Sequence, residues 1–153
     1  MADFFGSLRA SGALGVGDFL YSYTRAFRLG LQGDGNLVLC ALDLNNPAIR
    51  QYAYYRGDQF EAILRVAPYS KALWATGTNG TNARSWIMQA DGNLVVYAGY
   101  NGQGPPVWAS GTQGHYYSTL VCQDDGNLVI YLYEYNSGFV GPIWSSNTYA
   151  GPR

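Results

Sequence analysis

Hydrophobic and polar residues alternate in the stretch "QADGNLVVY" at residues 89–97. Gln89, Asp91, Asn93, Val95 and Tyr97 occupy every second position. Alternate side chains of a strand share one face, so the pattern predicts a strand with a polar row on one face. Leu94 and Val96 fall between these positions and form an apolar row on the opposite face. Strand interiors are normally poor in Asp and Asn, so a face that collects them is unusual.

The same pattern occurs three times along the chain. "QGDGNLVLC" (32–40) and "QDDGNLVIY" (123–131) match the first stretch, and strands with one Trp each follow as "LWATGT" (73–78), "VWASGT" (107–112) and "IWSSNT" (143–148). Repeated units of this kind bury their apolar rows in a shared core. We therefore predict a single domain over residues 1–153, with repeats at about 8–78, 79–112 and 113–148. The predicted core includes Trp74, Trp108 and Trp144.

The first repeat is longer than the other two. The chain from Asp34 to Trp74 is much longer than that from Asp91 to Trp108. The additional residues fall in an insertion at about 42–72. Strand-like segments flank Gly57-Asp58 there, so we predict an extended hairpin.

Composition narrows the class of protein. Charged residues make up 12% of the chain and the formal net charge is −1. The chain therefore lacks the excess of basic residues that is typical of nucleic-acid-binding proteins. Many Gly and aromatic residues favour short strands joined by turns. No apolar run is long enough to span a membrane, so we expect no membrane insertion. The N-terminus lacks a signal-peptide pattern, so we expect a cytoplasmic protein; secretion by an unusual route or from a processed precursor is the alternative.

The chain has few residues suited to metal binding or redox chemistry. Cys40, Cys122 and the single histidine, His115, match no metal-ligand spacing, so we expect no metal and no cofactor. Strand parity places Cys40 on the polar row and Cys122 on the apolar row. We therefore expect two free thiols, which agrees with a reducing compartment.

The polar row is a candidate binding surface. Amide, carboxylate and phenol groups beside a small hydrophobe suit a polyhydroxylated ligand, because hydroxyls both donate and accept hydrogen bonds. The alternative is that Asp-Gly and Asn only form turns and the other polar groups only face solvent. Repetition of all five positions in register favours the ligand.

The motif Q-x-D-x-N-x-V-x-Y resembles the signature of the bulb-type, snowdrop-like monocot mannose-binding lectins. "LRASGALGVGDFL" (8–20) is similar to the opening segment of that family, and the resemblance covers about residues 8–148 apart from the insertion. It implies an all-β fold, the β-prism II, with three four-stranded antiparallel sheets around a pseudo-threefold axis. It also implies one mannose pocket in each sheet.

The resemblance implies a role for each residue of the motif. In the second site, Asp91 and Asn93 would hold the axial 2-hydroxyl of mannose, Gln89 the 3-hydroxyl and Tyr97 the 4-hydroxyl, and Val95 would pack on the ring. The third site would repeat these roles with Gln123, Asp125, Asn127, Val129 and Tyr131. The first repeat keeps Gln32, Asp34, Asn36 and Val38, but Cys40 replaces the Tyr. We therefore expect site 1 to be degenerate. The cysteines that family members commonly bridge are also absent, since Gly35 and "ARSW" (83–86) occupy their places.

These observations predict a non-catalytic, multivalent lectin for α-D-mannose and mannose-containing glycans. The expected partners are high-mannose glycans and glycoproteins, and the resemblance implies a homodimer formed by exchange of the C-terminal strand. A glycosidase would need two carboxyl groups close together, whereas a prism separates the motif Asp residues by sheet, so we expect no enzyme. The alternative is an interaction or toxin protein, bacteriocin-like or taste-modifying-like, that uses the fold without a sugar.

Overall fold

The computed structural model describes residues 2–42, 69–134 and 138–149. Almost all of the predicted insertion, including the hairpin expected around Gly57-Asp58, lies outside these residues. None of the described residues form a helix with the length and hydrophobicity needed to cross a membrane.

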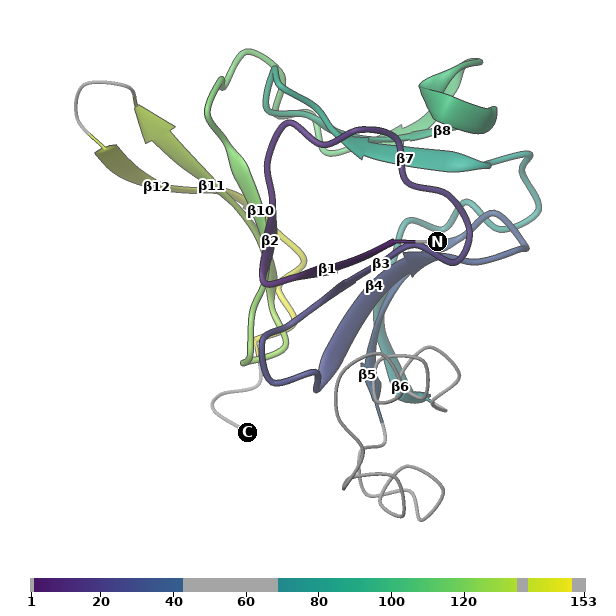
Figure 1. Cartoon of the computed structure of the whole chain (residues 1–153), viewed down its shortest axis with the longest axis horizontal. Coiled ribbons are helices and arrows are strands. Elements are labelled where there is room, and N and C mark those ends of the chain that lie inside the picture. Colours follow the sequence, from purple (N-terminus) through teal and green to yellow (C-terminus); the bar gives the residue numbers. More distant parts are fainter. Residues whose placement is uncertain (1, 43–68, 135–137, 150–153) are drawn as a thin grey trace.

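Short strands in three sheets make up the fold (Figure 1). The first sheet contains β1 (Asp3–Phe5), β3 (Phe19–Tyr21), β4 (Phe27–Leu31), β5 (Leu37–Leu42) and β6 (Tyr69–Ala75), in that order. The second sheet contains β7 (Ser85–Met88), β8 (Leu94–Tyr97) and β9 (Pro106–Ala109). The third sheet contains β12 (Gly138–Ser145), β11 (Leu128–Glu134), β10 (Thr119–Cys122) and β2 (Ser7–Leu8), in that order. One short 3-10 helix, η1 (Tyr100–Gly102), is the helical element of the described residues.

The three sheets form the sides of a triangular prism (Figure 1), so the predicted all-β, β-prism II fold is confirmed. Strand pairs are antiparallel except for β1 with β3, which is parallel. The sheets have five, four and three strands rather than four each. The N-terminal segment explains the difference: β1 joins the first sheet, β2 joins the third, and Leu14 contacts the second only by an isolated bridge to Trp86.

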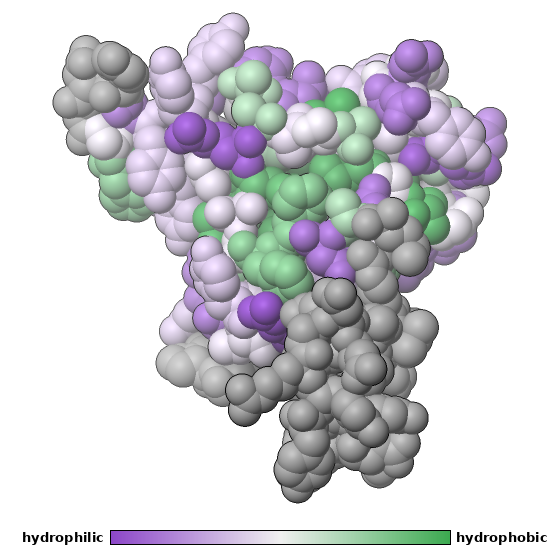
Figure 2. All heavy atoms as spheres, viewed as in Figure 1, coloured by the Kyte–Doolittle hydropathy of each residue, from purple (hydrophilic) through white to green (hydrophobic). Residues whose placement is uncertain are grey.

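Each motif strand turns its apolar row toward the centre of the prism. Leu94 and Val96 of β8, like Leu128 and Ile130 of β11, are fully buried, as the alternation predicts. Complete burial of one such side chain stabilises the fold by about 1.5–3 kcal/mol. Figure 2 shows apolar side chains gathered at the centre of the viewed face, with more hydrophilic ones around them.

The three repeated tryptophans meet one another. The rings of Trp74, Trp108 and Trp144 pack edge to face, with centroids 5.3–5.9 Å apart. They are half-buried and lie against the core, whereas Trp86 is fully buried within it. One Trp from each repeat therefore joins the three sheets.

Both cysteines are free, as predicted, and both are buried; burial was expected for Cys122 on the apolar row but not for Cys40 on the polar row. Cys122 lies in the central core, whereas Cys40 lies in a separate cluster on the outer face of the first sheet. Burial raises the pKa of both thiols, and the nearby Arg28 guanidinium partly opposes this rise at Cys40.

Candidate functional site

The motif Q-x-D-G-N forms the same tight turn in each repeat. In the second repeat, the Gln89 N–H donates to the Asn93 carbonyl at 2.9 Å, and the Asn93 N–H donates to Asp91 Oδ1 at 3.0 Å. Gly92 has φ +93°, and a Cβ there would lie 2.3 Å from the His115 carbonyl oxygen. Only glycine fits this position without strain.

The Asn side chain connects this turn to the Trp strand. Asn93 Oδ1 accepts hydrogen bonds from Ser110 Oγ at 3.1 Å, the Gly111 N–H at 3.0 Å and the Thr112 N–H at 3.2 Å. Asn36 Oδ1 accepts in the same way from Thr76 Oγ1 and from the Gly77 and Thr78 N–H groups. Asn127 Oδ1 accepts from Ser146 Oγ and the Thr148 N–H, whereas the N–H of Asn147, which replaces the Gly, donates to Ser145 Oγ. Sequence reasoning found the repeated W-[AS]-[TS]-[GN]-T segment but assigned it no part in the site; its hydroxyls and amides position the Asn.

Turn formation therefore uses one oxygen of each Asp and Asn side chain, as the alternative interpretation of the motif expects. In the second site the other atoms remain available. Among the described residues, none bonds Asp91 Oδ2 or Asn93 Nδ2, so an acceptor and a donor lie side by side. The turn and a ligand can be served by different atoms of the same residues.

The rest of the second-site row is also brought together. The Tyr97 hydroxyl donates to Gln89 Oε1 at 3.0 Å, across the length of the motif. Val95 lies between them and is only 3% exposed, so it forms the floor of the site. Gln89, Asp91, Asn93 and Tyr97 are half-buried on the outer face of the second sheet.

The third site has the same arrangement with one more internal bond. Tyr131 donates to Gln123 Oε1 at 2.6 Å, and Gln123 Nε2 donates to Asp125 Oδ2 at 3.0 Å. Val129 is again the floor, at 3% exposure, and the Asn127 N–H donates to Asp125 Oδ1 at 2.9 Å. Burial, with smaller effects of the Asp125 charge and Tyr133, raises the pKa of Tyr131. The phenol therefore stays neutral and able to donate at neutral pH.

The first repeat builds a different surface. Val38 and Cys40 are buried in a cluster with Tyr21 and Leu42, against which Phe5 and Phe19 pack. Arg28 lies opposite Cys40 on β4, and its guanidinium carbon is 4.5 Å from the centre of the Phe19 ring. Gln32 and Asp34, at the other end of the row, are exposed. Sequence reasoning identified the Cys40 replacement but missed the aromatic side chains that cover Cys40. The signal in the sequence is the pair of aromatic residues at the alternate positions 19 and 21.

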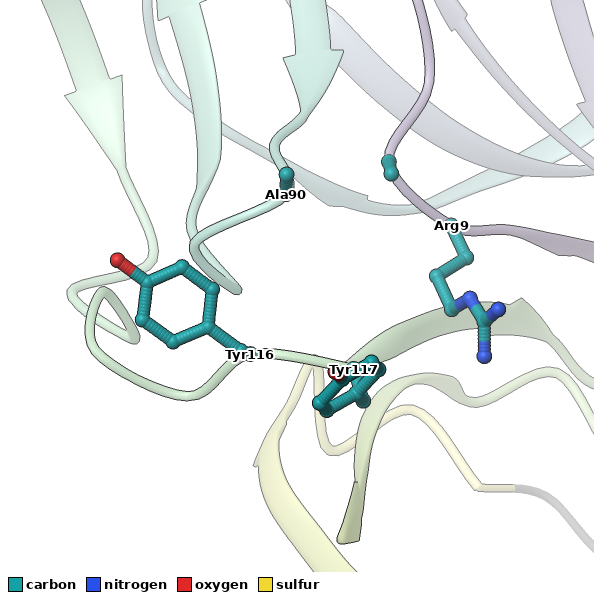
Figure 3. A pocket seen from close by; sticks show the side chains of 5 residues that line it. Arg9, Ala90, Tyr116 and Tyr117 are labelled. Atoms are coloured by element: carbon teal, nitrogen blue, oxygen red, sulfur yellow. The ribbon is translucent and has the colours of Figure 1, made fainter. Parts of the chain in front are cut away.

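A separate pocket lies between the second and third sheets and was not predicted. It has a volume of about 490 Å³, and its lining consists of Arg9, Ala10, Ala90, Tyr116 and Tyr117 (Figure 3). Ala90 lies between the site residues Gln89 and Asp91, so the pocket adjoins the second site along the chain. The described residues contain no group of His, Cys, Asp and Glu that could hold a metal ion.

Several solved structures are similar to this chain over nearly its whole length. A lectin from Marasmius oreades is 26% identical, covers 97% of both chains and has a TM-score of 0.67. Monomeric monocot mannose-binding lectins from Gastrodia elata are 32% identical, over 94% of this chain and 98% of theirs, with a TM-score of 0.61. The mannose-specific agglutinin of snowdrop (Galanthus nivalis), in complex with methyl α-D-mannoside, is 31% identical over 95% of this chain and 99% of its own, with a TM-score of 0.55. No family model and no curated protein matches the sequence. Identity above 30% over almost the full length, together with the shared prism, shows that this chain is a carbohydrate-binding lectin of the bulb-type, snowdrop-like monocot mannose-binding family.

Proposed function

We propose that the protein binds α-D-mannose and mannose-containing glycans through the second and third sites, without catalysing a reaction. One observation carries the proposal: in both repeats an Asp carboxylate and an Asn amide, each held by the turn through one oxygen, lie beside a hydrogen-bonded Gln–Tyr pair over a buried Val. In the third repeat Asp125 Oδ2 also accepts from Gln123 Nε2 and keeps a further lone pair for a ligand. These groups offer acceptors and donors in a fixed order on a half-buried face. Similarity to the mannose-specific snowdrop agglutinin supports the same ligand.

The chemistry of the turn supports preference for an axial hydroxyl. A hydroxyl beside Asp91 and Asn93 donates to the carboxylate and accepts from the amide. Asp91 Oδ1 and Asn93 Oδ1 are held by backbone and side-chain bonds, so the two free atoms are already oriented before the sugar arrives. Glucose has an equatorial 2-hydroxyl that leaves these groups imperfectly paired, at a cost of about 1–3 kcal/mol.

The first site is proposed to be silent. Cys40 cannot replace the phenol as a donor to Gln32, because a thiol is short and a weak donor. Phe19 and Arg28 also cover the apolar half of the row. Two working sites in one chain would still give multivalent binding to branched glycans and glycoproteins, in which avidity exceeds the affinity of a single site.

Calorimetric titration with methyl α-mannoside tests the proposal, with methyl α-glucoside as the matched control. We expect about two sites per chain and a dissociation constant near the millimolar range, roughly −4 kcal/mol. Glucoside is expected to bind about tenfold or more weakly. Equal binding of the two sugars would refute the mannose specificity, and no heat with either would refute the site itself.

We also propose a homodimer, which would double the number of sites. The similar Gastrodia elata lectins are monomeric, so the mass of this protein in solution is the test. Light scattering coupled to size exclusion gives the mass directly. The mass of one chain at all concentrations would exclude the dimer and leave the two intrachain sites unaffected.

A further inference from the structure

The third site continues beyond its motif as two aromatic rings. Tyr133 follows Tyr131 by two positions on β11 and so lies on the same face, and Phe139 lies opposite Tyr133 on β12. The Phe139 ring centre is 5.6 Å from that of Tyr131 and 5.5 Å from that of Tyr133. Tyr133 is 37% exposed and Phe139 is 59% exposed. We refer to Tyr133 and Phe139 as the aromatic extension.

A pocket lies beside the aromatic extension. It has a volume of about 340 Å³, and its walls are residues 114–117 on one side and Leu132, Tyr133 and Glu134 of β11 on the other. This volume lies within the range of small-molecule sites in proteins. The loop wall is anchored, because the His115 N–H donates to the Asp91 carbonyl at 3.0 Å and Ser118 Oγ donates to the His115 carbonyl at 2.5 Å.

The second site has no aromatic extension, although its five motif residues are of the same types. Tyr97 lies opposite Pro106, as Tyr131 lies opposite Pro142, so the two sites align in register. In that alignment Gly99 replaces Tyr133 and Gln103 replaces Phe139. The molecule therefore contains the same motif with and without the two rings.

We propose that the aromatic extension is a second sugar subsite, which holds the ring next to the mannose of an oligomannoside bound at the third site. The inference rests on the proposed function, because the first ring must occupy the motif. Exposed aromatic faces carry negative charge density and attract the C–H groups on one face of a pyranose ring. The Phe139 ring touches Tyr131 directly and Tyr133 packs on Phe139, so a ring attached to the sugar at Tyr131 reaches the aromatic extension without leaving the surface. The third site then prefers disaccharides, whereas the second site is selective for a single ring.

The test uses full-length chains in which one site remains. Asp91→Asn removes the second site and Asp125→Asn removes the third, and each keeps an oxygen for the turn. Both variants are titrated with methyl α-mannoside and with α1,2-, α1,3- and α1,6-linked mannobiose. With only the third site present, we expect at least one mannobiose to bind roughly three- to tenfold more tightly than the monosaccharide. With only the second site present, we expect no gain above about twofold.

Two further variants assign the gain to the rings. In the chain that keeps only the third site, Tyr133→Ala and Phe139→Ala are each expected to reduce the mannobiose gain and to leave methyl mannoside binding unchanged. Phe139→Tyr should retain the gain, and Gln103→Ala, at the matching place of the second site, should change nothing. Monosaccharide binding without any mannobiose gain, or a gain that survives both alanine variants, would overturn this inference alone. No monosaccharide binding at the third site would overturn the proposed function and this inference with it.

Discussion

The outer face of the first sheet and the outer faces of the other two sheets carry the same Gln, Asp, Asn and Val row, yet they are different surfaces. On the second and third sheets, the strand beside the row presents Ser85 and Ile87, or Thr119 and Val121, and the polar row stays half-open. On the first sheet, Arg28 occupies the neighbouring position opposite Cys40, and Phe19 covers Gly30.

This difference shows that a site depends on two things: the motif, which sets the turn, and the neighbouring strands, which set whether the row is accessible. The turn geometry is set within the motif and by its Trp strand, and it is alike in all three repeats. The valines of all three rows are buried, but residues of other strands also bury Cys40 against Phe5, Phe19 and Tyr21, whereas the matching Tyr97 and Tyr131 stay half-buried. The Gln, Asp, Asn and Val positions alone therefore do not distinguish an open row from a covered one; within the motif only Cys40 marks the first row.

The largest expected effect comes from the motif carboxylates. Asp91→Asn and Asp125→Asn should each remove one site, and the double variant should lose all measurable mannoside binding, because each loses a charge-assisted hydrogen bond worth about 1.5–3 kcal/mol. Asn keeps an oxygen for the turn, so the thermal midpoint should hardly change. Asp34→Asn is the matched control and should leave both affinity and stoichiometry as they are. Loss of a binding site with Asp34→Asn would erase the contrast between the first sheet and the other two.

The turn glycines should give the next largest effect, on stability. Gly92→Ala forces a Cβ to within 2.3 Å of a carbonyl oxygen at positive φ, so we expect a loss of about 2–4 kcal/mol. Gly126→Ala is also at positive φ, but its Cβ meets the Phe27 ring at 3.1 Å and the Thr148 carbonyl oxygen at 3.2 Å, so its cost should be smaller than at Gly92. Gly33→Ala has open space around it and should cost under about 0.5 kcal/mol. Urea unfolding measures all three, and equal costs at Gly33 and Gly92 would contradict the turn geometry.

Restoring the missing tyrosine separates the two explanations of the first site. If Cys40 were the only defect, Cys40→Tyr would create a third mannoside site. Cys40 is only 5% exposed and lies beneath its aromatic neighbours, so we expect no new site. The larger ring should instead destabilise the fold by about 1–3 kcal/mol through overpacking. Calorimetric stoichiometry decides between these results, and three sites per chain would show that the cover is displaced.

The smallest expected effect is a loss of stability at alkaline pH, when Tyr131 of the third site ionises. The pKa of folded Tyr131 is raised above that of an unfolded tyrosine, chiefly by burial. Its contribution to stability is therefore complete below about pH 10 and is lost as the pH rises through the folded-state value. Asp125→Asn removes a secondary cause and should lower the Tyr131 pKa without returning it fully. Carbon-13 NMR of labelled tyrosine follows this titration, with Tyr131→Phe to assign the signal; no change in Asp125→Asn would exclude the carboxylate as a cause.

Much of this fold could be predicted from local patterns. Period-two alternation gave the inward and outward rows, and burial of Leu94, Val96, Leu128 and Ile130 confirms them. The tripled motif and its Trp strand predicted three sheets around one core. These features depend on alternation within one strand and on repetition of short motifs, so a single sequence contains them.

Other features arise from contacts between segments that are distant in the sequence. The alternation of hydrophobic and polar residues within one strand does not predict such contacts. The N-terminal segment distributes β1, β2 and Leu14 among three sheets, so their strand counts became five, four and three. Ser110 and Thr112 position Asn93 from the opposite end of a hairpin.

The sequence by itself determined the repeats, the turn and the five types of side chain on each outer row, because strand parity and the glycine turn are local properties. Only the tertiary structure decided which rows stay open. Whether Phe19 and Arg28 cover a row, or Tyr133 and Phe139 extend one, depends on strands that pair across a sheet, and packing there is set by shape rather than by spacing along the chain.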